Sequence, residues 1–260
     1  MPRKDPATRT SEDPHLLANL YGAHSAWALQ WPSSQIAPDP DMILIDSGTP
    51  IGPLNIAYVL RPAGALAAVE RAAKFFGDRS RPWRLEAPVA LRPRLNSAAR
   101  SVGLTQVELR PAHAMARDEL RPARPTPEFS VQKVDSAEKA RVFRATIIEG
   151  MSGKPSQDVS PPARNLLPDM TLYVGYVAGE PVATAGLFAY RGVAGIYAVS
   201  TVERARRHGY GRAITERAAL DGFEAGCFVS FLQSSVMGRS VYEGMGYRWI
   251  FDRAVWSPPV

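Results

Sequence analysis

The residues best suited to chemistry lie at one predicted junction between a strand and a helix. The apolar run from Ala194 to Val199 is typical of a strand, and the segment after Gly209 can form a helix. Arg206, Gly209 and Gly211 stand between them in the spacing Arg-x-x-Gly-x-Gly. A helix N-terminus presents unpaired N–H groups and a positive dipole end, and glycine lets a ligand approach the backbone closely. The junction therefore predicts an anion site of the kind that holds a pyrophosphate.

Two other glycine-based phosphate loops do not fit these residues. A Walker loop requires a Lys-Ser or Lys-Thr pair, and the chain contains neither. A dinucleotide-binding loop requires a third glycine or alanine, and Ile214 stands at that position. The structural alternative is that Gly209 and Gly211 simply end a strand and begin a helix.

The remaining pattern has a counterpart in a known family. Val-x-Thr followed by Arg-x-x-Gly-x-Gly resembles the acyl-coenzyme A loop of the GNAT acetyltransferase superfamily, with Glu203 where a proline is usual. Because that proline mainly fixes φ, the change affects loop stiffness more than chemistry. The resemblance implies acetyl-CoA as co-substrate, with pantetheine along the strand edge and pyrophosphate on the loop. The cofactor-binding residues that it implies are Val199, Ser200, Thr201, Arg206, Arg207, His208, Gly209, Tyr210, Gly211 and Arg212.

A second motif follows about thirty residues later. After a predicted buried strand (227–233) and a short helix (237–245), Tyr242 and the pair Gly246-Tyr247 resemble the second GNAT signature. The resemblance implies that Tyr242 is the catalytic acid that protonates the departing thiolate. A phenol with a pKa of about 10 can serve a thiol with a pKa of about 8.5. The alternative is a core tyrosine with a solvated hydroxyl.

Together the motifs predict a transferase, an N-acetyltransferase that moves an acetyl or other acyl group from acyl-CoA to an amine. The amine attacks directly, so no enzyme nucleophile is needed. The general base stays open among Glu149, Tyr190, Tyr197 and Ser200, and the acceptor is not determined. Two alternatives remain: a coenzyme A-binding sensor or pseudoenzyme, and an acyltransferase that uses aminoacyl-tRNA.

Composition limits the other functional classes. The chain has 260 residues, 45% hydrophobic, no apolar run of transmembrane length and no apolar core in its polar N-terminus. A single cysteine, Cys227, favours the cytoplasm, and four scattered histidines predict no metal site. The net charge of +6 comes from dispersed arginines, which leaves nucleic acid open as a partner without indicating it.

The order of predicted elements defines the domains. Residues 1–14 are predicted as a flexible lead, 15–115 as a degenerate GNAT-like domain, 116–128 as a Pro- and charge-rich linker, and 129–260 as the acyltransferase domain. The fold class is α/β with two tandem GNAT-like domains, each a mixed, mostly antiparallel sheet flanked by helices. In the second half, a capping box at Asp135–Glu138 begins the first helix, and a short helix is expected near 162–167.

The first half repeats this element order without its motifs. A helix over 62–78 is predicted to bury Leu66, Val69, Ala73 and Phe76, but Leu60-Arg-Pro-Ala-Gly stands where the phosphate loop would be. The alternative is an unrelated α/β domain. If the two domains are in tandem, the first is expected to shape the acceptor site.

Overall fold

A computed structural model of the chain describes residues 13–124, 126–152, 169–235 and 238–259. Contacts divide them into two compact units. Of the described residues, the first unit comprises Asp13, His24–Ala112 and 250–259, and the second comprises Pro14–Ala23 and His113–Trp249. Helix α1 (Pro14–Ala28), strand β5 (Gln106–Ala116) and strand β11 (Arg248–Ser257) therefore each run from one unit into the other. The two units are defined by contacts alone. The domain boundary that the sequence places at residues 116–128 therefore stays a prediction.

The first unit is a five-stranded sheet with two helices packed on one face. The strand order is β1-β2-β3-β4-β11, with β1 (Gln35–Pro38), β2 (Met42–Asp46), β3 (Ile56–Val59) and β4 (Arg84–Pro88). The strands pair antiparallel except β3 with β4, because α2 (Ala65–Gly77) forms a crossover between them. Helices α2 and α3 (Arg92–Ser101) enclose a core that includes Phe76, Trp83 and Trp256.

Helix α2 departs from its prediction in two ways. It begins at Ala65 rather than Pro62, and Leu66 is 41% exposed rather than inward. The buried face consists of Ala65, Ala68, Val69, Ala72 and Phe76, with Ala73 partly buried beside it. Val69 and Phe76 are inward as predicted, but Ala65, Ala68 and Ala72 complete the buried face in place of Leu66.

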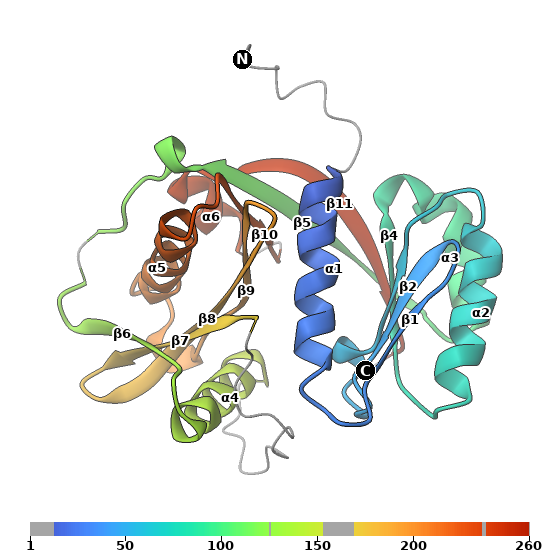
Figure 1. Cartoon of the computed structure of the whole chain (residues 1–260), viewed down its shortest axis with the longest axis horizontal. Helices are drawn as coiled ribbons and strands as arrows, with labels where there is room; N and C mark the ends of the chain where they lie inside the picture. The colour runs from blue at the N-terminus through green and yellow to red at the C-terminus, as the bar shows by residue number, and fades with distance from the viewer. Residues whose placement is uncertain (1–12, 125, 153–168, 236–237, 260) are drawn as a thin grey trace. The chain divides into compact units, whose positions relative to one another are not determined.

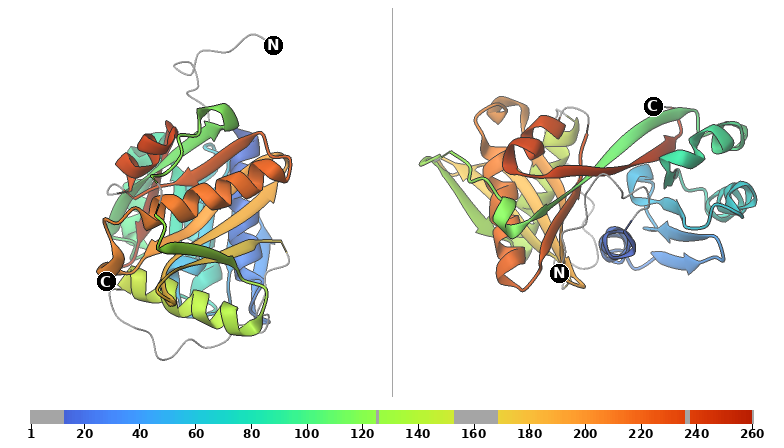
Figure 2. Two further views of the ribbon diagram at one scale, coloured as in Figure 1. Left: turned by 90° about the vertical axis from the view of Figure 1, so that its left-hand side faces the viewer. Right: turned by 90° about the horizontal axis from the view of Figure 1, so that it is seen from above.

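The second unit is a mixed sheet with helices on both faces. The strand order is β5-β10-β9-β8-β7-β6, and only β9 pairs parallel with β10 among the registers recorded within it. Its elements in chain order are β6 (Phe129–Lys133), α4 (Ala137–Ser152), β7 (Thr171–Val177), β8 (Glu180–Tyr190), β9 (Val193–Thr201), α5 (Tyr210–Glu224), β10 (Val229–Gln233) and α6 (Arg239–Met245). Helices α4 and α5 lie on opposite faces of this sheet (Figure 1), and α5, drawn in orange, crosses one face (Figure 2).

The predicted fold class is confirmed: the structure is α/β with mixed, mostly antiparallel pairing flanked by helices. The predicted helix near 162–167 and residue 237 lie outside the described residues. At the start of α4 the cap is Ser136, whose Oγ accepts from the Lys139 N–H at 3.2 Å. Helix α1 and strand β1 were not predicted, although Leu16, Leu20 and Ala23 are buried at helical spacing.

Two features are absent from the described residues. No helix there is long and apolar enough to cross a bilayer. No group of three or more His, Cys, Asp or Glu side chains in the described ranges is arranged to hold a metal ion.

Candidate active site

Strand β9 loses its partner on one side near its C-terminal end. Its recorded pairing with β10 runs from Val193 opposite Val229 to Ile196 opposite Leu232, whereas its pairing with β8 continues to Thr201. On the other side its register with β8 shifts between Thr184 and Gly186. At this bulge Ala198 has a φ of 53°, and its carbonyl accepts from Thr184 Oγ1 at 2.8 Å. Among the described residues, no β10 partner is recorded for the main chain of 198–200, which is the stretch of β9 that a ligand could reach.

Helix α5 begins close to this open strand end. Gly209, with a φ of 86°, is its N-cap and makes no side-chain cap hydrogen bond, and the first intrahelical bond runs from the Ala213 N–H to the Gly209 carbonyl at 3.0 Å. A Cβ at Gly211 would lie 3.1 Å from Thr201 Oγ1, so the first turn packs directly on β9. The first N–H groups and positive dipole end of α5 therefore lie beside the end of β9, as the sequence predicted for an anion site.

The arginines of the loop have different roles. Arg206 donates from Nε to the Thr201 carbonyl at 3.2 Å and from Nη2 to the Gly150 carbonyl at 2.9 Å. Arg212 donates from Nη2 to the Arg121 and Pro122 carbonyls at 2.9 and 3.0 Å. Arg207 is exposed at a φ of 68°, and within the described ranges no partner is recorded for its guanidinium. Arg206 and Arg212 therefore hold the loop in place, whereas Arg207 is available to an anion.

Two aromatic side chains support the loop. His208 donates from Nδ1 to the Arg206 carbonyl at 2.8 Å, and its ring stacks on Tyr210 with centroids 5.6 Å apart. Tyr210 is buried, stacks on Phe129 at 4.9 Å, and donates its hydroxyl to Glu128 at 2.9 Å. Burial and this hydrogen bond raise the pKa of Tyr210 above its ordinary value. Tyr210 thus packs beneath the loop.

Tyr242 lies on α6, the short helix after β10. A Cβ on Gly238 would lie 3.2 Å from its ring, and the ring meets Tyr247 edge-on at 6.0 Å. Burial disfavours the phenolate and raises the pKa of Tyr242 to about 12. Tyr242 therefore remains protonated at neutral pH and can donate a hydrogen bond. The larger gap to a thiol pKa of about 8.5 makes complete proton transfer less favourable than the sequence suggested.

The segment predicted as a linker is bound to the second unit. The Arg121 N–H donates to the Met245 carbonyl at 2.9 Å, and the Ala123 N–H donates to the Glu216 carboxylate. Gly246 ends α6 with a φ of 105°, and a Cβ there would clash with the Glu119 carbonyl. Gly246 of the second signature must therefore be a glycine, because residues 116–128 pass too close to it for a Cβ.

The four open candidates for the general base separate in the structure. The Glu149 carboxylate is paired with Arg204, and Tyr190 lies on the β8–β9 hairpin with Arg191 5.1 Å from its ring centroid. Ser200 and Tyr197 lie on the open stretch of β9, where Ser200 packs against Gly150 of α4. The structure thus brings only Tyr197 and Ser200 to the open part of β9.

One residue that the sequence analysis missed holds this part of the second unit together. Asn19 of α1 donates from Nδ2 to the Phe188 and Val193 carbonyls at 3.0 and 2.9 Å, and its Oδ1 accepts from the Tyr197 hydroxyl at 2.7 Å. A Cβ on Gly195 would clash with the Asn19 side chain. These contacts join segments more than 160 residues apart, so no local pattern could have indicated them.

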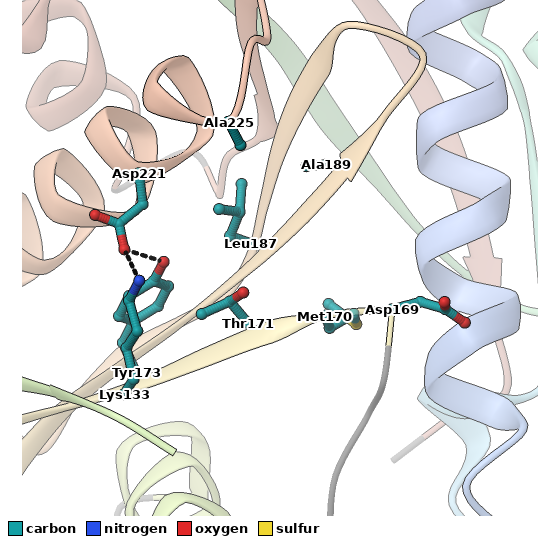
Figure 3. Close-up of a pocket in the computed structure, with 9 residues that line it drawn as sticks. All are labelled: Lys133, Asp169, Met170, Thr171, Tyr173, Leu187, Ala189, Asp221 and Ala225. Carbon is teal, nitrogen blue, oxygen red and sulfur yellow. Dashed lines mark hydrogen bonds and ion pairs between the residues drawn. The ribbon is translucent and has the colours of Figure 1, made fainter. Parts of the chain in front are cut away.

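A cavity of about 220 Å³ lies toward the opposite end of α5 (Figure 3). Within it, the buried Asp221 carboxylate accepts from Lys133 and Tyr173 and pairs with Arg217, each at 2.8 Å. Burial alone would raise the pKa of Asp221, but these partners lower it below its usual range. Because Asp221 is eleven residues along α5 from Tyr210, about 17 Å away, the cavity is separate from the loop. The network ties α5 to β6 and β7.

The corresponding junction of the first unit is filled by acidic side chains. At Gly64, before α2, a Cβ would clash with the Asp41 carboxylate. Arg71 holds Asp39 and Asp41 there, with hydrogen bonds of 2.7 to 3.0 Å. Since carboxylates repel phosphate, this junction is closed to a pyrophosphate by the chain's own residues.

A protein-family model matches most of the second half of the chain. Residues 144–247 match the model of the acetyltransferase (GNAT) family, and this match includes both motifs. These residues therefore form a GNAT-family acetyltransferase domain. A search of curated proteins finds no match.

Solved structures share the fold over most of the chain. A GCN5-related N-acetyltransferase from Kribbella flavida aligns with a TM-score of 0.71 at 20% identity, covering 96% of this chain and 97% of that one. A GCN5-related N-acetyltransferase from Sphaerobacter thermophilus aligns at 0.60 with 14% identity over 85% and 82%. A GCN5-related N-acetyltransferase-like protein from Streptococcus suis aligns at 0.56 with 15% identity over 92% and 96%. At these identities the likeness concerns the fold.

Proposed function

We propose that the protein is an N-acyltransferase that moves an acetyl or related acyl group from acyl-CoA to an amine. The observation that carries the proposal is the uncapped N-terminus of α5, placed directly against the end of β9 where its pairing with β10 stops. One ligand that presents a diphosphate to the helix and an amide-bearing arm to the strand edge would satisfy both. Acyl-CoA has these two parts, and the GNAT match over the same residues supports it.

The reaction would proceed by direct attack. The amine nitrogen bonds to the thioester carbonyl carbon, the C–S bond breaks, and the thiolate receives a proton. Tyr242 is our candidate for that donor, because its pKa of about 12 keeps it protonated. The nitrogen loses a proton to a base near the open stretch of β9, where Tyr197 and Ser200 lie. Binding and orientation of the two substrates supply most of the acceleration in such a reaction.

The coenzyme A loop is tested by comparing two exposed arginines that both have positive φ. Arg207 lies in the loop, at 68°, and Arg191 lies on the β8–β9 hairpin, at 50°. Arg207→Met should raise the Kd for acetyl-CoA roughly tenfold, because a charge-assisted contact to phosphate is lost. Arg191→Met is the matched control and should leave the Kd unchanged, as measured by isothermal titration calorimetry.

Thiol release measured with a panel of amines separates catalysis from binding. Release of free coenzyme A with an acylated product in mass spectra supports acyl transfer. Tight acetyl-CoA binding without release from any amine would instead identify a coenzyme A sensor. Failure of acetyl-CoA to bind at all would remove the proposed function.

A further inference from the structure

Helix α4 carries a guanidinium that the loop does not use. The Nε and Nη2 atoms of Arg144 are buried, and neither has a hydrogen-bond partner among the residues that the structure describes. Burial and the nearby charge of Arg141 both lower the pKa of Arg144. An arginine stays protonated in proteins, so the N–H groups on these two nitrogens remain without an acceptor. The side chain as a whole is only partly buried, so an anion could reach it and accept from these donors.

The helical geometry of α4 indicates which way Arg144 faces. Helix α4 packs across β7, β8 and β9, and Phe143, which is 1% exposed, faces the sheet. Glu149 lies on one flank, where it pairs with Arg204 just beyond the C-terminal end of β9. At about 100° per residue, Arg144 lies on the other flank, which faces back along β9 toward Tyr197.

The same geometry separates Arg144 from the coenzyme A loop. Arg206 of the loop reaches the Gly150 carbonyl, near the C-terminal end of α4. Arg144 is six residues earlier, about 9 Å along the helix axis. An anion at Arg144 would therefore belong to the second substrate rather than to the diphosphate at α5.

We propose that Arg144 binds an oxyanion of the acceptor, so that the acceptor is an amine that also carries a carboxylate or phosphate group. The proposal rests on the proposed acyl transfer and adds the substrate class. A guanidinium fork matches either oxyanion with two parallel hydrogen bonds, and the anion would supply acceptors for the two buried nitrogens that have none among the described residues. The acceptor nitrogen would then lie near the open stretch of β9.

Paired acceptors test the substrate class. Thiol release is compared for phenylalanine and phenethylamine, lysine and cadaverine, and phosphoethanolamine and ethanolamine. In the wild type, kcat/KM for the anionic member should exceed that for its neutral partner at least tenfold, and the pair that responds separates carboxylate from phosphate. Arg144→Met should remove this preference by raising KM for the anionic acceptor, with KM for acetyl-CoA unchanged. Equal use of neutral amines, or equal loss for both members, overturns the proposal.

Thermal melting provides a readout that does not need activity. Because two nitrogens of Arg144 are buried without acceptors, Arg144→Met should raise Tm without ligand, whereas Arg141→Met, an exposed arginine one turn earlier on α4, should not. Coenzyme A with N-acetylphenylalanine or N-acetylphosphoethanolamine should raise the wild-type Tm more than that of Arg144→Met. A lower Tm for Arg144→Met would show a structural role and overturn the inference, even if no amine is acylated and the proposed function fails separately.

Discussion

At the residue scale, two tyrosines close to each other in the sequence have different surroundings: Tyr242 lies within α6, and Tyr247 follows the end of that helix. Tyr247 is 2% exposed and its hydroxyl lies 2.6 Å from Ser230 Oγ in the core. Tyr242 is only partly buried and packs on Gly238. Tyr247 is thus a packing residue with a satisfied hydroxyl, whereas Tyr242 keeps an exposed part, and its role as the proton donor stays a prediction.

Tyr242→Phe should lower kcat by roughly a hundredfold, at the low end for a general acid, because its pKa of about 12 makes it a weak proton donor. The Kd for acetyl-CoA should change little. A group with this pKa stays protonated well above neutrality, so kcat should show no fall from its ionisation below about pH 10. Tyr247→Phe is the control: it should cost about 1 kcal/mol of stability and leave kcat intact. Unchanged kcat in Tyr242→Phe would remove the residue from the chemistry.

At the element scale, helix ends in the second unit depend on left-handed glycines. Gly226 follows α5 with a φ of 92°, and nothing lies within 4 Å of a Cβ built there. Gly246 ends α6 with a φ of 105°, and a Cβ there would clash with the Glu119 carbonyl. Both glycines have a positive φ. Of the two, only Gly246 also lies so close to another segment that a Cβ would clash with it.

Gly226→Ala should therefore lower the free energy of unfolding by about 1 to 2 kcal/mol, the cost of a left-handed alanine. Gly246→Ala should lower it by roughly 1 to 3 kcal/mol more, because backbone atoms must shift to relieve the clash. Urea unfolding followed by circular dichroism measures both. Equal losses for the two variants would show that the 116–128 segment does not press on α6.

At the scale of the whole molecule, three elements have residues in both units: α1, β5 and β11. Strand β11 begins in the second unit and pairs with β4 in the first, where Arg253 lies opposite Pro88. Arg253 is fully buried and donates from Nε to the buried Glu86 carboxylate at 2.9 Å. Within the first unit, β11 and β4 are thus joined by a buried ion pair in addition to their ladder of hydrogen bonds.

Arg253→Met should lower the free energy of unfolding by about 3 to 5 kcal/mol, because it leaves a buried carboxylate without its cation. Lys74→Met breaks an exposed pair with Asp78 in the same unit and should cost less than about 1 kcal/mol. Thermal melting of both variants gives the comparison. Similar small shifts would mean that the Arg253–Glu86 pair does not anchor β11.

The sequence by itself determined the features that depend on local chain geometry. Glycine is favoured wherever φ is positive, so the positions of Gly209 and Gly246 along the chain indicated where α5 starts and where α6 ends. The short apolar runs that form β8, β9 and β10 indicated strands, because a short continuous run of apolar residues is typical of a strand buried in a sheet. These local signals predicted most elements and the position of the anion loop.

Only the tertiary structure decided which side chains within those elements are available for function. The sequence assigns Arg206, Arg207 and Arg212 alike to the anion loop, yet Arg206 and Arg212 donate to backbone carbonyls of distant segments whereas Arg207 is exposed. The same is true of Asn19, which reaches Tyr197. A side chain's role depends on the partners that folding brings to it, and those lie tens to hundreds of residues away, beyond the reach of any local pattern.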